Sequence, residues 1–174
     1  MITEADMTTL CDWHHGMDVS GWLATERYEG LRVIWDGFTL WHRTGEQLDA
    51  PPAFLKGLPC DIALDGVLWG GPGGTASVRR FARRGRDAFT PEMKLVVFDA
   101  VLPGPYLHRI EQARQALMEC PNAFVTTVSR IGSTDEAVEL ARLVRAEGGT
   151  GLVLRSPEDK GYRPGRNPLA LRLG

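Results

Sequence analysis

The sequence predicts an α+β fold in which mostly antiparallel sheets are flanked by helices. Short apolar segments of strand length alternate with turn signals, and only two longer segments show helical periodicity. With 174 residues, 43% of them hydrophobic, the chain is long enough to bury a core. We therefore expect a single domain over residues 1–174.

The first half of the chain contains most of the strand signals. We expect strands at residues 22–26, 31–35, 38–41, 61–69 and 93–98. The Asp36-Gly37 pair is a strong hairpin turn signal, since both residues tolerate the positive φ that such turns need. The strand 61–69 ends at a glycine-rich loop, 70–74, which lacks the spacing and the Lys-Ser/Thr pair of a phosphate-binding loop and is interpreted as a flexible connection.

The second half contains the two helical segments. In residues 106–119 one apolar stripe is formed by Leu107, Ile110, Ala113 and Leu117. A second helix begins at Ser133, which has capping-box spacing to Glu136, and ends at Gly148-Gly149. Three further strands are expected at residues 123–128, 151–155 and 169–173.

Composition limits the classes of function. A net charge of -2 gives no global attraction to nucleic acid, so any DNA affinity requires a local basic patch. Three cysteines, an odd number without metal-type spacing, fit a reducing compartment better than a disulfide framework. The N-terminal residues are acidic and without an apolar run, and no apolar run of membrane-spanning length follows, so we expect no signal peptide and a cytoplasmic protein without a membrane partner. His14-His15 have no cysteine or carboxylate at ligand spacing, which favours a surface or packing role over metal binding.

One short motif points to a known family. Arg27, one spacer, Glu29-Gly30, another spacer and Arg32 follow one another directly. This string resembles the first motif of ATP-dependent DNA ligases, in which a lysine, one spacer, Asp-Gly, a second spacer and an arginine occur in that order. Arg27 stands at the position of the lysine, which attacks the α-phosphorus of ATP in that family.

Four further segments resemble the later motifs of the same family, in the same order. They are LDGVLWGG at 64–71, LVVFDA at 95–100, GTGLVLRSP at 149–157 and YRPGRNPLALRLG at 162–174. The resemblance covers nearly the whole chain from Asp12 onward. It implies a ligase-like, or ATP-grasp-like, nucleotidyltransferase domain of the small bacterial or phage type.

The departures from the family fall on its reacting and metal-binding residues. Those positions carry Arg27, Glu29, Val67, Thr150 and, in the last motif, Arg172 and Gly174. A guanidinium stays protonated at any working pH and has no free lone pair for attack on phosphorus. Valine and threonine supply no carboxylate for Mg²⁺. We therefore predict that lysyl-AMP formation is lost, name no catalytic residue and no metal site, and do not expect Mg²⁺ binding of the family type.

The resemblance implies a nucleotide site that binds ATP or AMP. Its predicted residues are Glu26, Arg27, Arg32, Asp65, Phe98, Arg155, Arg166 and Arg172. By composition alone, a core position is the better explanation for Phe98 at the end of an apolar strand. In these ligases the chain continues into an OB-fold domain, and because this sequence ends at Gly174 we expect that domain to be absent.

A basic segment, residues 78–86, is the candidate DNA contact. Its arginines are Arg79, Arg80, Arg83, Arg84 and Arg86. Such a cluster suits contact with the phosphates of nicked or duplex DNA, and equally suits a solvated surface.

Three hypotheses about function follow. The first, which we favour, is a noncatalytic ligase-like domain that binds nucleotide, DNA or a protein partner. The second is an active ligase or nucleotidyltransferase of DNA repair or replication with an altered mechanism. The third is a protein-binding regulatory module that uses the same scaffold.

Overall fold

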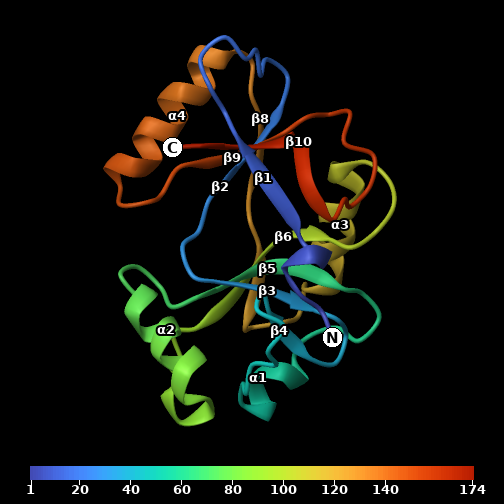
Figure 1. The fold of residues 1–174 in the computed structure, drawn as a ribbon, viewed down its shortest axis with the longest axis vertical. Coiled ribbons are helices and arrows are strands. Elements are labelled where there is room, and N and C mark those ends of the chain that lie inside the picture. Colours follow the sequence, from blue (N-terminus) through green and yellow to red (C-terminus); the bar gives the residue numbers. More distant parts are fainter.

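The computed structural model describes residues 1–174 as two five-stranded sheets, one above the other in Figure 1. The upper sheet has the strand order β1 (Thr8–Asp12), β10 (Gly165–Leu173), β9 (Leu152–Arg155), β2 (Leu23–Glu26) and β8 (Val128–Arg130). The lower sheet has the order β4 (Leu40–His42), β3 (Leu31–Trp35), β5 (Leu64–Trp69), β6 (Lys94–Ala100) and β7 (Ala123–Val125). All strand pairs are antiparallel except β1–β10 and β6–β7. The predicted α+β class is confirmed.

Four helices flank the sheets. In Figure 1, α4 (Thr134–Ala146) lies beside the upper sheet, and α3 (Tyr106–Ala116) packs against β6. The helices α1 (Pro52–Lys56) and α2 (Thr75–Arg84) lie below the lower sheet. Short 3-10 turns occur at Glu4–Asp6 (η1) and Arg86–Ala88 (η2). None of the helices combines the length and apolar character needed to cross a bilayer.

Each sheet has its own hydrophobic core on the face that points away from the other sheet. In the upper half, Leu152, Leu154 and Leu171 pack with Ala137 and Ala141 of α4. Successive residues of a strand point to opposite faces, so the residues between these leucines face the lower sheet.

The lower sheet follows the same rule. Val33, Leu68 and Leu95 are buried together with Val78 and Phe81 of α2. Full burial of each such side chain contributes about 1.5–3 kcal/mol. The residues that alternate with them face upward, so the two sheets present their second faces to each other.

Two motif glycines are required by close backbone packing. A Cβ atom on Gly30 would lie 2.2 Å from the Leu68 carbonyl oxygen, and one on Gly66 would lie 2.4 Å from the Val96 carbonyl oxygen. No larger residue fits at either place without moving a strand.

Most predicted strands occur within a few residues of their expected bounds, but the single strand expected at 123–128 is wrong. This segment is divided into β7 and β8, which belong to different sheets. Thr126 donates its backbone N–H to the Val97 carbonyl oxygen, and the chain then leaves the lower sheet and crosses to the upper one. The apolar pattern runs through this crossing, which is why it predicted one strand.

The helix boundaries also differ in part from expectation. The helix expected at 106–119 ends at Ala116, where Leu117 forms its C-cap. At the start of α4, Ser133 accepts from the Glu136 backbone N–H as predicted, whereas the Glu136 carboxylate accepts from Gly132, one residue before the cap. β1 and α1 were not predicted, because their sequences are short and without clear periodicity.

Candidate nucleotide-binding cleft

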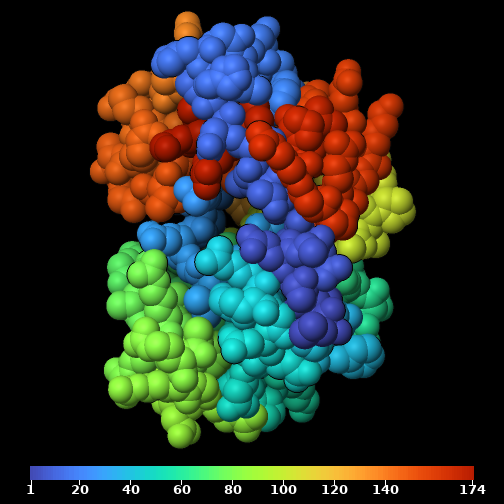
Figure 2. Space-filling view, in the orientation of Figure 1, coloured from blue at the N-terminus to red at the C-terminus, as the bar shows by residue number.

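A cleft of about 370 Å³ lies between the two sheets. Figure 2 shows the surface hollowed at mid-height, where the N-terminal segment passes between the upper and lower halves. This volume is at the small end of the range for pockets that bind small molecules.

The strand registers explain which residues line this cleft. In the upper sheet, Thr25 of β2 pairs with Val153 of β9, and both line the cleft. In the lower sheet, Arg32 of β3 pairs with Val67 of β5, which pairs in turn with Val96 of β6. These residues occupy the positions between the core residues described above, so the same alternation that builds the cores also builds the cleft.

Arg32 is held rigidly in the floor of the cleft. Its Nε and Nη2 atoms donate to the two carboxylate oxygens of Asp65 at 2.7 and 2.6 Å, and Nη2 also donates to the Thr8 carbonyl oxygen. Burial disfavours the charged guanidinium, but the wholly buried Asp65 carboxylate more than offsets this and raises the pKa of Arg32. Tyr162 donates its hydroxyl to the same carboxylate, and burial together with Asp65 raises the pKa of that phenol.

Phe98 is half-buried and lines the cleft from β6. The Arg32 Cζ atom lies 4.9 Å from the centre of its ring, in cation–π geometry. The ring is therefore accessible in the cleft rather than enclosed in a core.

Arg27 lies in the cleft without an ion-pair partner. Its backbone N–H donates to the Gly151 carbonyl oxygen at 2.9 Å, and the Thr150 hydroxyl donates to the Arg27 carbonyl oxygen. Partial burial and the nearby charge of Arg172 lower the pKa of Arg27. Two cations close enough to perturb each other form a site that an anion would stabilise.

The other arginines of the cleft differ in their partners. Arg172, on β10, forms an ion pair with Asp12 at 2.7 Å, and both side chains are partly exposed. Arg43 follows β4 and, like Arg27, is in no ion pair. The cleft also contains three carboxylates, Glu4, Glu26 and Glu29. Burial, followed by the charge of Glu147, raises the pKa of Glu26.

Arg155 belongs to a buried charge network behind the cleft. Arg109 of α3 donates to Asp99 at 2.9 and 3.1 Å and to Asp159 at 3.1 Å. Arg155 lies 3.4 Å from Asp99 and 3.8 Å from Asp159, but none of its nitrogens makes a hydrogen bond. Instead, its guanidinium lies over the Tyr106 ring at 4.6 Å. The network joins β6, α3 and β9, and therefore connects the two sheets.

At the two positions where the resemblance implies metal-binding glutamates, the chain supplies no carboxylate. Nowhere in the structure do three or more His, Cys, Asp or Glu side chains gather as metal ligands. Val67, at a position where the family has glutamate, lines the cleft with an apolar side chain, and the Thr150 hydroxyl is engaged by the Arg27 carbonyl oxygen. These residues do not fit Mg²⁺, which prefers carboxylate and water oxygens in octahedral geometry.

The structure brings most of the predicted nucleotide-site residues together. Those that line the cleft are Glu26, Arg27, Arg32, Phe98, Arg155 and Arg172. Asp65 lies beneath the floor as the partner of Arg32. Arg166 is not among the residues that line the cleft. Its exposed side chain donates to the Cys11 sulfur.

Sequence reasoning missed one side of the cleft. Thr8, Thr9 and Leu10 of β1 line it, as do Tyr28 and Arg43. Tyr28 lies inside the first motif, so its place in the cleft could have been predicted from the sequence. No local sequence pattern predicts that the β1 residues line the cleft.

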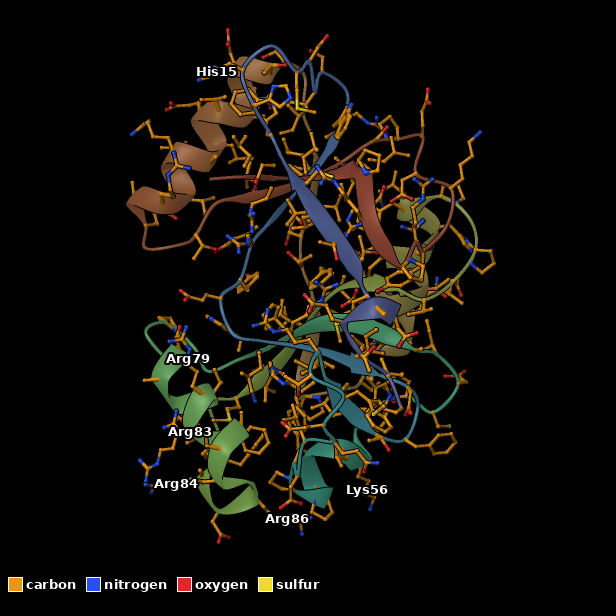
Figure 3. All side chains as sticks on the ribbon, in the orientation of Figure 1. His15, Lys56, Arg79, Arg83, Arg84 and Arg86 are labelled. Carbon is orange, nitrogen blue, oxygen red and sulfur yellow. The ribbon has the colours of Figure 1, made fainter.

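The arginines of the predicted DNA-contact segment lie on α2 and η2. The α2 arginines, by which we mean Arg79, Arg80, Arg83 and Arg84, are exposed and in no ion pair. Arg86 follows in η2 and pairs with Asp49 at 2.7 Å. Figure 3 shows Arg79, Arg83 and Arg84 on the outer side of α2, in the lower half of the molecule and outside the cleft.

Comparison with known proteins supports the motif resemblance. No protein-family model matches the chain. The DNA ligase of Haemophilus influenzae is 26% identical over 163 residues, which is 92% of this chain and 60% of that ligase. The chain thus spans about 60% of the length of this curated relative.

Solved structures give the fold. A Lig E DNA ligase superposes with a TM-score of 0.83 at 21% identity, covering 96% of this chain and 67% of that one. The Chlorella virus DNA ligase-adenylate gives 0.79 at 18% identity, covering 99% and 67%. The ATP-dependent DNA ligase of bacteriophage T7, in complex with ATP, gives 0.69 at 14% identity, covering 97% and 68%. The chain therefore has the fold of the nucleotidyltransferase, or adenylation, domain of ATP-dependent DNA ligases.

Proposed function

We propose that this chain is a DNA ligase-like domain that binds ATP or AMP noncovalently in the cleft and does not form a lysyl-AMP intermediate. The observation that carries the proposal is the absence of lysine from the cleft. All five cationic side chains that line it are arginines.

The three lysines of the chain lie elsewhere. Lys56 is exposed at the end of α1, Lys94 is at the start of β6, and Lys160 is exposed in the loop after β9. None of them lines the cleft. A guanidinium cannot replace the amine, because it has no free lone pair at working pH.

The same residues support binding. Arg27 offers an unpaired guanidinium near Arg172, and a planar fork of donors suits phosphate oxygens. The half-buried Phe98 ring offers an apolar surface for a base in the same cleft. Similarity to ligases whose structures contain adenylate or ATP is consistent with this ligand class.

Intact-mass measurement tests the chemical half of the proposal. The protein is incubated with ATP and Mg²⁺ or Mn²⁺, with the bacteriophage T7 ligase as the positive control. We expect no mass increase corresponding to AMP. A covalent AMP adduct would refute the proposal.

Calorimetric titration with AMP and ATP tests the binding half. Replacing Arg27 by Gln is expected to weaken binding about tenfold or more, since a hydrogen bond to a charged group contributes about 1.5–3 kcal/mol. Arg114→Gln, on the exposed side of α3, is the matched control and should leave the affinity unchanged. Equal affinities of the Arg27 and Arg114 variants for AMP and ATP would show that the nucleotide does not contact Arg27.

We further propose that the α2 arginines contact the phosphates of duplex DNA. The observation that favours this is their exposure without ion-pair partners, which leaves their charge free for phosphate. Similarity to a Lig E ligase studied for DNA binding supports the partner class. The salt dependence of binding to a nicked duplex tests this proposal.

A further inference from the structure

Three aromatic side chains from distant parts of the sequence meet beside the cleft. Tyr28 follows β2, Trp69 ends β5, and Phe124 lies in β7. The Tyr28 ring centre is 5.2 Å from that of Trp69 and 6.0 Å from that of Phe124, and Trp69 and Phe124 are 6.3 Å apart. All three contacts are edge to face. We call Tyr28, Trp69 and Phe124 the aromatic cluster.

Core packing does not account for this cluster. None of the three residues belongs to a hydrophobic core of either half or packs against one. Phe124 is 36% exposed, and Tyr28 and Trp69 are both partly exposed. An edge-to-face group leaves ring surface open to solvent, and open aromatic surface is what an unpaired base stacks upon.

The charges around the aromatic cluster are distributed unevenly. Lys94 is the direct cross-strand partner of Trp69 in the β5–β6 pair and is in no ion pair. The loop 70–74 leads from Trp69 directly into α2, so the α2 arginines follow on the same segment of chain. The acidic neighbour is Glu26, which lies near Tyr28. Phosphates of a strand that lies on the cluster are therefore favoured on its Lys94 and α2 side.

We propose that the aromatic cluster is a stacking site for an unpaired base of single-stranded DNA, whose backbone runs over Lys94 toward the α2 arginines. Such a site combines a basic path for phosphates with aromatic surface for bases, and it is tolerant of sequence because every base has a π-face. It adjoins the nucleotide cleft, because Tyr28 lines that cleft, whereas Trp69 and Phe124 lie outside it.

The test is binding of a fluorescently labelled twelve-residue oligo(dT), measured by anisotropy at several salt concentrations. Phe124→Leu and Trp69→Leu are expected to weaken binding about tenfold each, within the range observed for loss of one base-stacking aromatic. Phe38→Leu is the matched control, because Phe38 is 79% exposed in the β3–β4 turn and makes no aromatic contact. Lys94→Gln should weaken binding and reduce its salt dependence.

An oligomer of abasic deoxyribose phosphates separates stacking from charge in the unaltered protein. We expect it to bind more weakly than oligo(dT) and to be insensitive to Phe124→Leu. Equal binding of both oligomers, or equal effects of the Phe124 and Phe38 changes, would overturn the proposal. Stronger binding of an RNA oligomer of the same sequence would overturn the choice of DNA.

AMP titration of the same variants distinguishes a loss of base stacking on the aromatic cluster from a loss of nucleotide binding in the cleft. Phe124→Leu should leave the AMP affinity unchanged. Loss of oligo(dT) binding with intact AMP binding supports the stacking site, whatever the result of the AMP measurements on the Arg27 variant.

Discussion

Replacing Arg109 by Met should be among the most destabilising single changes in this protein. Arg109 is 1% exposed and donates to Asp99, to Asp159 and, at 2.7 Å, to the Gly104 carbonyl oxygen. Two buried carboxylates are balanced there by two guanidinium groups. After the substitution, Arg155 alone faces both carboxylates, and its nitrogens make no hydrogen bond in the present arrangement.

The expected loss follows from these contacts. Removing one partner of a buried ion pair costs about 3–5 kcal/mol, and leaving a buried carbonyl oxygen without a donor costs about 1–3 kcal/mol. We expect a loss of about 4 kcal/mol, because the hydrophobic Met side chain recovers part of this by filling the space. For a chain of this length, that corresponds to a fall in Tm of about 10–15 °C.

Urea denaturation followed by circular dichroism measures the effect. Arg114→Gln is the matched control on the same helix, since its ion pair with Glu111 is exposed on both sides and such pairs contribute little. Arg109→Lys should fall between the two, because it keeps the charge but loses the fork of donors. A loss below about 1 kcal/mol for Arg109→Met would refute the view that this network holds the two sheets together.

Three further predictions concern the cleft, the basic surface and the upper core. Arg27→Lys alone should give no covalent AMP in an intact-mass measurement, since Val67 and Thr150 still supply no metal ligand; recovery of adenylylation would show that the cleft is otherwise competent. Changing the α2 arginines to alanine should reduce the slope of log K against log salt for nicked duplex by about 3–4, because each phosphate contact contributes about 0.9; an unchanged slope would place DNA elsewhere. Leu154→Ala should cost about 3 kcal/mol of unfolding free energy, whereas Leu143→Ala on the exposed side of α4 should cost far less, as thermal denaturation can establish.

Much of the cleft could be predicted because motif spacing and strand alternation agree. Arg32 and Phe98 fall at positions where a strand points away from its own core, and the family resemblance placed both in one predicted nucleotide site. Periodicity alone would have placed them on strand faces, but it could not predict that the faces of two different sheets lie opposite each other.

Other parts could not be predicted because they depend on contacts between distant segments. Arg166 was predicted for the nucleotide site, but it is not among the residues that line the cleft, and its side chain contacts Cys11 of the distant strand β1. β1 closes one side of the cleft through a parallel pair with β10, over 150 residues away in the sequence. Such pairing leaves no local signal.

The aromatic cluster illustrates the same limit. Tyr28, Trp69 and Phe124 come from three segments, and each alone is consistent with ordinary strand-end packing. Only the folded chain shows that they contact one another and stay outside both cores.

The structure explains what several motif residues contribute to the fold. Gly30 and Gly66 have no room for a Cβ atom, and Asp65 and Asp99 are buried partners of arginines. Changing any of these residues would destabilise the fold by several kcal/mol.

The replaced positions are of a different kind. Arg27 and Val67 line an open cleft, and Thr150 contributes a hydroxyl to a backbone carbonyl oxygen. A substitution at these positions leaves no buried charge without its partner, so it costs the fold less than a change at Asp65 or Asp99. Similarity in the motifs of this chain therefore carries information about its architecture.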